Sequence, residues 1–348
     1  FTGMAVYTEK EKFQKLAFED VAKNKAPYPK NSNDGWIAVL QHYFFSAWLP
    51  KNGTPREFYT RKLDENLYAA GVIVPDGTLG AGASATVTVP LYAGPQEQEQ
   101  LAKIAPGLDL TIDYGWLTVI AVPLFWVLAR LYDWTGNWGV AIILLTVIMK
   151  AIFFPLTVKS MRSMKSMQAI QPQVNQLRAK HKNDSAKLQQ ETMALYRQHG
   201  VNPLGGCLPM IVQIPVFYAL YVALSVAVEI QNAPFICFGR APSWLPLLGG
   251  KDLWICNLAD FDPTYVLPLL MGASMFIQQR MTPVMGDPRQ AKVMLLMPVV
   301  FTFMFLNLPS GLVLYWTLSN VLQIAQQHYM DRGTAKAAKT PARAAKKA

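Results

Sequence analysis

The sequence of 348 residues has little charge, little cysteine and no recognisable enzyme motif. Charged residues make up 16% of it, whereas an ordinary soluble domain carries about 25%. Three cysteines are too few for a disulfide-stapled scaffold. The chain has no GxxxxGK[ST] loop, HExxH motif or GxSxG motif, and its four histidines are scattered without metal-ligand spacing. These absences exclude a single soluble globule and predict no enzyme activity, no metal, no cofactor and no transport driven by the chain's own ATP hydrolysis.

What the sequence does contain is divided unevenly. Hydrophobic residues make up 52% of the chain. Residues 1–116 hold 11 Lys and Arg against 13 Asp and Glu, whereas residues 117–348 hold 21 against 9. We therefore predict a mildly acidic, water-exposed first part and a basic membrane-embedded second part. The sequence opens at Phe1 without an initiator Met, so we expect an upstream part to be missing.

Five apolar blocks in the second part predict membrane-spanning helices. The first block has 20 residues, or roughly 30 Å as a helix, which is enough for a bilayer core. The last three have shorter apolar cores than a span usually needs, so they are either core helices or spans in a thinned membrane. Their regular succession favours spans. The blocks are residues 139–158, 208–230, 265–279, 293–308 and 311–327.

The connecting segments predict the orientation of these spans. Residues 159–201 hold eight Lys and Arg against two acidic residues, and residues 280–292 hold three against one. Residues 231–264 hold only two basic residues against three acidic ones. Because basic loops stay in the cytoplasm, the 231–264 loop and residues 1–116 are expected outside and the C-terminus inside.

Residues 117–134 resist this scheme. Their apolar run has only 13 residues and contains Pro123, and a span there would move the N-terminal part to the basic side. We expect an amphipathic helix in the outer interface, with Trp126, Tyr132 and Trp134 at headgroup level. A true span is the alternative.

Residues 1–116 are predicted to be rich in β-structure. Alternating segments at 58–63, 71–74 and 85–92 are typical of strands, and residues 35–48 predict one buried strand or a strand pair. A short helix is expected at 96–104. Four or five strands are few for a closed sandwich, so this part is expected to be the end of a larger β-domain.

Residues 159–201 are predicted to form a helical hairpin outside the membrane. Met164, Met167, Val174 and Leu177 recur at helical spacing among polar residues. Together with Met161, the methionines could form an adaptable surface for apolar sequences, although plain helix packing explains the same stripe. The basic tail at 331–348 could bind anionic lipid or ribosomal RNA, or remain solvated.

Lys150 is the one basic residue inside an apolar block, close to the predicted midplane. A cation there is costly unless it meets water or a partner, and the one acidic residue of the blocks, Glu229, sits at the outer end of the second block. We therefore predict that it faces a water-filled cavity, with snorkelling towards the inner headgroups as the alternative. Other polar residues of the blocks support a cavity, although each could make an ordinary interhelical hydrogen bond: Thr146, Gln213, Ser274, Gln278, Thr317, Ser319 and Asn320.

Cys237 and Cys256 both lie in the 231–264 loop. An oxidising outer compartment would let them pair, while two free thiols fit the sequence equally well.

Several ordered strings resemble one family. They are LDLTIDYGW at 108–116, GNWG at 136–139, FPLT at 154–157, VNPLGGC at 201–207 and PSGLVLYW at 309–316. In them the chain resembles the YidC insertases of the Oxa/YidC/Alb family, of the Gram-negative type, over nearly its whole length. The resemblance implies an α-helical polytopic membrane protein with a five-span core, an interfacial helix and a cytoplasmic hairpin. It also implies that the N-terminal part is the end of a periplasmic β-sandwich domain.

The resemblance further implies an insertase and chaperone of the bacterial inner membrane, acting alone or with the Sec translocon. Its substrates would be nascent inner-membrane proteins, and a hydrophilic groove open to cytoplasm and lipid would receive them. Lys150 stands where the family usually has Arg, and Tyr315-Trp316 stands where it often has two tyrosines. The groove would hold Lys150, Thr146, Gln213, Tyr315, Trp316, Ser319 and Asn320, and the recruitment hairpin Met161, Met164, Met167, Arg178 and Lys180.

The ribosome is expected to bind the hairpin and the basic tail, and DNA is not expected as a partner. A secondary transporter and a passive assembly scaffold are the competing functions. Internal repeats with broken helices would favour a transporter, and the sequence shows no such repeat.

Overall fold

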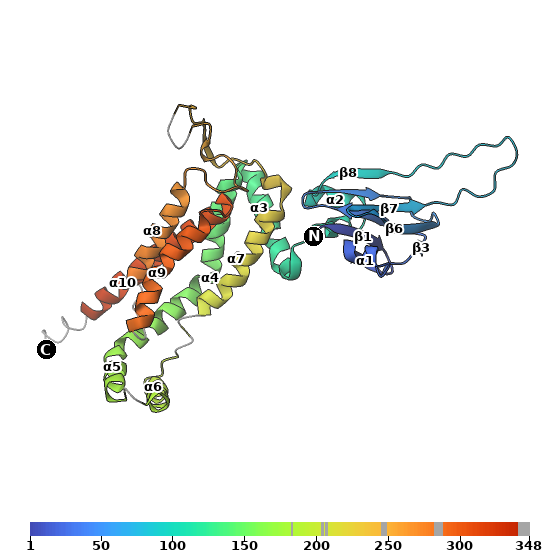
Figure 1. Ribbon diagram of the computed structural model, residues 1–348. Coiled ribbons are helices and arrows are strands. Elements are labelled where there is room, and N and C mark those ends of the chain that lie inside the picture. Colours follow the sequence, from blue (N-terminus) through green and yellow to red (C-terminus); the bar gives the residue numbers. More distant parts are fainter. Residues whose placement is uncertain (182–183, 203–204, 206–207, 245–248, 282–287, 340–348) are drawn as a thin grey trace. The chain divides into compact units, whose positions relative to one another are not determined.

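The computed structural model describes the chain except for residues 182–183, 203–204, 206–207, 245–248, 282–287 and 340–348. It divides into two compact units. The first comprises Phe1–Thr118 with Val226–Glu229, and the second comprises Val119–Ser225 with Ile230–Ala348. Strands are concentrated in the first unit and long helices in the second (Figure 1).

The first unit is built from two antiparallel sheets. One has five strands in the order β2-β1-β4-β5-β8, and the other has three in the order β3-β6-β7. The described residues of this unit therefore form eight strands, more than the four or five expected. The strands are β1 (Gly3–Thr8), β2 (Lys12–Leu16), β3 (Asn31–Ser32), β4 (Trp36–Leu40), β5 (Phe44–Trp48), β6 (Arg56–Asp64), β7 (Leu67–Ile73) and β8 (Leu91–Pro95).

The core of the first unit lies between the two sheets. Met4 and Val6 of β1, Ile37 of β4 and Phe58 of β6 are almost fully buried there. Val21 of helix α1 (Phe18–Ala22) closes the same cluster. All six residues of β1 are buried, because β1 lies between two partner strands and is covered on both faces.

The strand predicted at 85–92 is wrong for most of its length. Residues 74–90 form an extended loop, exposed almost throughout, and pairing with β5 begins only at Leu91. The alternation of Thr and Val is genuine, but β5 ends before it could pair with residues 85–90. The helix expected at 96–104 is α2 (Gln98–Ile104), and two short 3-10 turns, η1 (Leu108–Thr111) and η2 (Gly115–Leu117), follow it.

The second unit is a helical bundle in which α10 packs against α4 and α8, and α8 packs against α9. Its helices are α3 (Thr118–Thr135), α4 (Trp138–Ala169), α5 (Gln171–Lys180), α6 (Ser185–Gln198), α7 (Leu208–Val226), α8 (Val266–Met281), α9 (Pro288–Phe305) and α10 (Ser310–Lys339). The 3-10 turn η4 (Val228–Ile230) follows α7.

Helix α4 is longer than the predicted span. It runs unbroken for 32 residues, through Pro155 and past residue 158. The hairpin expected to begin at residue 159 therefore begins as a continuation of α4, and the chain turns only at Ile170. The remaining hairpin consists of α5 and α6, which pack against each other.

Helix α3 covers almost the same residues as the helix expected at 117–134. The helix continues through Pro123 and covers 18 residues. Among the described residues, two helical segments are long and apolar enough to cross a membrane, Gly115–Thr135 and Trp138–Ala169. Shorter apolar helices cover Ile211–Val226 and Val293–Phe305. Length and composition therefore do not exclude a span at 117–134, and the interfacial position of this helix stays a prediction.

Helix α10 extends well beyond the predicted block at 311–327. It continues as far as Lys339, so the first part of the basic tail predicted at 331–348 is helical. A helix that is already formed propagates more easily than a new one nucleates, which explains the extension. Residues 340–348 of the predicted tail lie outside the described residues.

Candidate functional site

Lys150 lies on α4 and is half-buried. Its Nζ donates a hydrogen bond to Oε1 of Gln323 on α10, over 3.2 Å. Among the described residues, Lys150 makes this one hydrogen bond and no salt bridge. An ammonium group has three donors and an amide oxygen carries no net charge, so the positive charge of Lys150 is held in place but not neutralised.

Three further polar side chains meet between α7 and α10: one from α7 contacts two from α10 that lie one helical turn apart. Nε2 of Gln213 donates to Oη of Tyr315 over 3.0 Å and lies 3.4 Å from Oγ of Ser319. Tyr315 is 2% exposed. Residues 315, 319 and 323 of α10 recur every four positions and so follow one face of the helix. This face joins the Gln213 cluster to the Lys150–Gln323 contact, and we call it the α10 polar stripe.

The remaining predicted groove residues lie elsewhere. Nδ2 of Asn320 donates to Oγ of Ser274 on α8, over 3.1 Å, in a buried contact. The indole ring of Trp316 packs edge-on against Phe217 at 4.6 Å between ring centroids. Both residues are offset from the stripe by one position, or about 100° around the helix. Trp316 thus contacts α7 and Asn320 contacts α8.

Thr146, one turn before Lys150, is fully buried. Its hydroxyl donates to the carbonyl oxygen of Ile142 over 2.7 Å. This bond to its own helix satisfies the donor, so the structure does not bring Thr146 into the polar stripe.

Gln323 is a residue of the site that the sequence analysis missed. It stands four positions after Ser319 in the same repeat of polar residues, and that spacing was the available signal. Its partner lies 173 positions away, so the contact itself could not be inferred from local sequence.

The methionines expected to form a recruitment surface are mostly packed away. Met161 and Met167 are buried, and Met164 is half-buried. All three lie on the last part of α4. They therefore anchor that part of the helix instead of presenting open thioethers.

The basic residues predicted for recruitment lie on α5. Arg178 is half-buried and Lys180 is exposed, both in the last turn of the helix. His181 Nε2 lies 3.0 Å from a carboxylate oxygen of Glu191 and so links the end of α5 to α6. No described residue of α6 is buried. The side chains of α6 are therefore partly or fully exposed.

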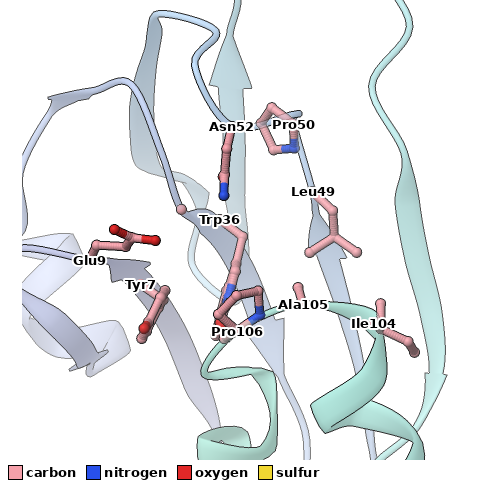
Figure 2. A pocket seen from close by; sticks show the side chains of 10 residues that line it. Tyr7, Glu9, Trp36, Leu49, Pro50, Asn52, Ile104, Ala105 and Pro106 are labelled. Atoms are coloured by element: carbon pink, nitrogen blue, oxygen red, sulfur yellow. The ribbon is translucent and has the colours of Figure 1, made fainter.

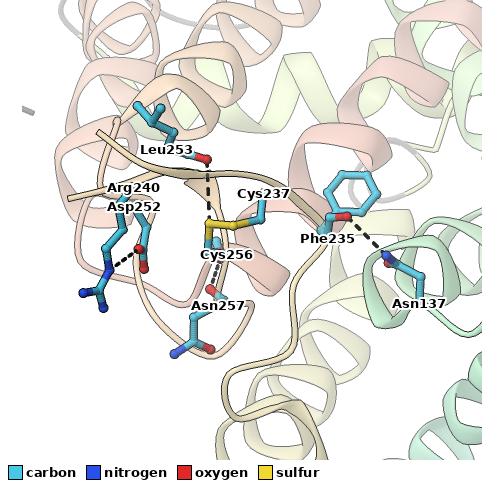
Figure 3. The surroundings of a disulfide bond; sticks show 9 residues. Asn137, Phe235, Cys237, Arg240, Asp252, Leu253, Cys256 and Asn257 are labelled. Atoms are coloured by element: carbon cyan, nitrogen blue, oxygen red, sulfur yellow. Dashed lines mark hydrogen bonds and ion pairs between the residues drawn. A yellow bond between two sulfur atoms is a disulfide. The ribbon is translucent and has the colours of Figure 1, made fainter. Parts of the chain in front are cut away.

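Cys237 of β9 (Ile236–Arg240) forms a disulfide with Cys256, the residue that follows β10 (Asp252–Ile255), with 4.6 Å between their Cα atoms (Figure 3). The hairpin they close is tied to the start of α4. The Nδ2 of Asn137 donates to the carbonyl oxygen of Phe235 over 3.2 Å, while its Oδ1 accepts from the N–H of Val140 as the helix cap.

The same loop, residues 231–264, also holds the first turns of α8 and α10. Both carboxylate oxygens of Asp262, which is 1% exposed, accept backbone N–H groups there, from Thr264 and from Leu267. The N–H of Ser310 donates to the backbone carbonyl oxygen of Asp260 over 2.7 Å. Its hydroxyl donates to the backbone carbonyl oxygen of Asn257 over 2.8 Å. The loop therefore fixes the N-terminal ends of three helices of the bundle, and the disulfide closes it.

A cavity of about 170 Å³ lies in the first unit (Figure 2). Trp36 and Pro106 form its base, and Leu49 and Ile104 line one side while Glu9 stands at the other. The indole N–H of Trp36 already donates to the carbonyl of Pro106 over 3.0 Å. Tyr7 and Asn52 add a hydroxyl and an amide to this lining, and Glu9 is its one carboxylate. The lining residues thus include no pair of acid and base and no activated nucleophile, which catalysis would need.

Comparison with known proteins decides the family. A model described as "60Kd inner membrane protein" matches residues 130–338, and one described as "YidC periplasmic domain" matches residues 1–127. The chain belongs to the YidC family. Members of this family are bacterial inner-membrane proteins with a periplasmic domain, and the β-sheet unit and the helical bundle correspond to the two matched regions.

Similar members of the YidC family carry the name "Membrane protein insertase YidC". The relative from Aromatoleum aromaticum is 53% identical over 95% of this chain and 58% of its own length. Those from Nitrosospira multiformis and Nitrosomonas eutropha are 53% and 49% identical, with 56% and 53% of their lengths covered. The chain thus spans a little over half the length of these relatives.

A solved structure has the same fold. It is titled "Active YidC insertase crystal structure with the first transmembrane domain resolved", and it matches with a TM-score of 0.51 at 21% identity. The match covers 94% of this chain and 83% of the other.

Proposed function

We propose that this chain is a membrane protein insertase that also helps inner-membrane proteins to fold. The observation that carries the proposal is Lys150, a cation on an apolar helix whose partner is a neutral amide. A carboxylate beside it would mark a structural ion pair, whereas an uncompensated charge can receive an acidic group of a substrate. The insertase names of relatives about 50% identical support the same function.

The proposed topology has five spans, α4, α7, α8, α9 and α10, with the C-terminus in the cytoplasm. The distribution of Lys and Arg among the connecting segments supports it. The β-sheet unit and the disulfide loop would then be periplasmic. We place α3 in the outer interface, because Trp126 and Trp134 are 57% and 86% exposed and Arg130 lies over the ring of Trp126.

The mechanism follows from the position of the charge. A short hydrophilic, acidic segment of the substrate would be drawn towards Lys150 and so avoid crossing the full membrane in lipid. Short spans would thin the bilayer and lower the remaining barrier. Burial of the substrate's apolar helix in lipid drives the step without a nucleotide. The membrane potential adds about 2.3 kcal/mol per 100 mV for each negative charge moved outwards.

The proposed partners are nascent inner-membrane proteins, the Sec translocon and the ribosome. The hairpin α5–α6 and the basic tail would contact the ribosome, because Lys180 is exposed on α5 and the tail adds further Lys and Arg. Exposed charges are screened with a Debye length of about 8 Å at physiological salt. Removing residues 332–348 should therefore weaken ribosome binding at low salt, and equal affinity with and without them would contradict this role.

Reconstitution in liposomes tests the function and separates it from its alternatives. The full chain alone, without ATP, should insert a single-span protein that carries an acidic tail. A secondary transporter would instead move a small solute, and a passive scaffold would bind the substrate without moving its tail across. Absence of insertion in well-sealed proteoliposomes would overturn the proposal.

A further inference from the structure

Gln323 is the feature of the helical unit that the proposed function leaves unexplained. Its Oε1 accepts the hydrogen bond from Nζ of Lys150, and both side chains are half-buried. Half-burial makes an ion pair between two such groups strong, because less water screens it. A glutamate would fit the same space and give a charge-assisted contact, yet the chain carries the neutral amide.

The position of Gln323 is fixed by contacts of the preceding two turns of α10. Tyr315 and Ser319, two turns and one turn earlier on the α10 polar stripe, are 2% and 6% exposed and contact Gln213 of α7. Helix α10 also packs directly against α4 (Figure 1). The Oε1 of Gln323 is therefore presented to Lys150 by a packed helix face.

We propose that Gln323 is a positioning residue that holds the ammonium group of Lys150 while leaving its charge uncompensated. One N–H of Lys150 is then occupied and its direction is set, and the remaining donors are available to a carboxylate of an incoming segment. The neutrality of position 323 makes the site selective for acidic segments. This inference rests on the proposed function, since it names what the same site recognises.

Substitution of a glutamate separates this role from simple packing. Gln323→Glu keeps the size and the acceptor but supplies Lys150 with an internal counter-ion that competes with the substrate. If Gln323 only filled space, this near-isosteric change would affect acidic and neutral substrates alike. If it keeps the charge available, only acidic substrates suffer.

The experiment uses the full chain in lipid nanodiscs and in proteoliposomes. The probes are two single-span peptides that differ only in their tails, one with aspartates and one with asparagines at the same positions. Binding is measured in nanodiscs, and insertion in proteoliposomes. Gln323→Glu should weaken binding of the acidic peptide about tenfold or more and leave binding of the neutral peptide unchanged.

Three further variants complete the test. Ala325→Glu adds the same charge at an exposed position two residues away and should change neither affinity. Gln323→Met removes the acceptor without adding charge, and should weaken acidic binding between about twofold and tenfold. In the background of Lys150→Ala, Gln323→Glu should have no additional effect, because the two residues act as one unit.

The inference is overturned if wild type binds both peptides equally, or if Gln323→Glu weakens both peptides equally or neither. These outcomes rest on binding, so they do not depend on insertion. Preferential acidic binding without any insertion in proteoliposomes would overturn the proposed function and leave the role of Gln323 standing. Equal melting temperatures of the variants in nanodiscs would show that the differences do not come from misfolding.

Discussion

The two units each contain a cation that is at least partly removed from bulk water, and the number of hydrogen-bond acceptors around the cation differs between them. In the β-sheet unit, Arg56 is 3% exposed and its five N–H donors reach five backbone carbonyls, those of Asn33, Gly35, Pro50, Lys51 and Thr54. In the helical unit, Lys150 has one neutral acceptor. A cation with every donor occupied fixes the chain around it, whereas a cation with free donors remains able to bind something else.

The largest effect is expected from Arg56→Met. The substitution leaves five carbonyl oxygens without their charged donor, and each buried acceptor without a partner costs about 1–3 kcal/mol. We expect the β-sheet unit to lose about 3 kcal/mol or more. Amide hydrogen exchange of strands β4 and β6 in the full chain would measure the loss. Arg56→Lys should also destabilise, since a lysine cannot form the same planar fork. If both variants exchange like wild type, Arg56 is not the structural cation of the comparison.

Lys150→Ala should have the opposite profile. A charge-assisted hydrogen bond is worth about 1.5–3 kcal/mol, so insertion of an acidic-tailed substrate should slow about tenfold or more. The melting temperature in detergent should hardly change, because the side chain gives up a single neutral contact. Lys150→Arg keeps the charge and should be tolerated. Normal insertion of acidic substrates by Lys150→Ala would remove the functional side of the comparison.

Lys15 and Asp113 form a partly exposed ion pair in the β-sheet unit, and this pair lies between the two cations above in expected effect. Burial raises the pKa of Asp113, but hydrogen bonds from Lys15 at 2.7 Å and from the N–H of Gly115, with the charge of Lys15, outweigh it and lower the pKa overall. A lowered pKa means stability that is present above the unfolded value of about 3.9 and lost as the pH falls through the folded value. The partly exposed pair is screened, so the expected loss is about 1 kcal/mol or less.

An acid titration of unfolding would measure this contribution. Asp113→Asn should flatten the dependence below about pH 4 and leave stability at neutral pH slightly reduced. An unchanged titration in the variant would mean that other carboxylates determine acid stability.

The smallest effect is expected from the exposed pair at the end of α4. Lys165 Nζ lies 2.7 Å from Asp331 on α10, and the two side chains are 32% and 46% exposed. Pairs of this kind contribute about 0–1 kcal/mol. Asp331→Asn should therefore change neither the melting temperature nor insertion measurably. A clear loss of insertion would show that this contact belongs to the site, and would extend the comparison to a third cation.

Sequence patterns predicted the elements whose signal is local. Alternation found β6 and β7 and the pair β4–β5, and apolar blocks found the helices of the bundle. Strand β1 was missed because it is buried on both faces, so its residues do not alternate. Residues 85–90 alternate clearly, but no neighbouring strand reaches them. Strand pairing depends on chain segments far apart, which a local pattern does not contain.

The same limit applies to the candidate site. Lys150 stood out because a charge inside an apolar block is costly, and Gln213 and Ser319 stood out as polar residues in apolar surroundings. Tyr315 was expected only from the resemblance to the family. Trp316 and Asn320 were predicted to share the groove, but adjacent positions of a helix face different neighbours, and these two side chains contact Phe217 and Ser274. Gln323 was missed because its role depends on a contact with a residue of another helix, 173 positions away along the chain.

The loop closed by Cys237 and Cys256 has a consequence for how the protein itself matures. In the proposed orientation these thiols reach an oxidising compartment only after the loop has crossed the membrane. A molecule inserted upside down would keep them in the reducing cytosol, and its loop would stay open. Only correctly oriented molecules would therefore form the disulfide. The disulfide would then stabilise the loop that holds the first turns of α4, α8 and α10. The presence of the disulfide would thus show which way a given molecule was inserted.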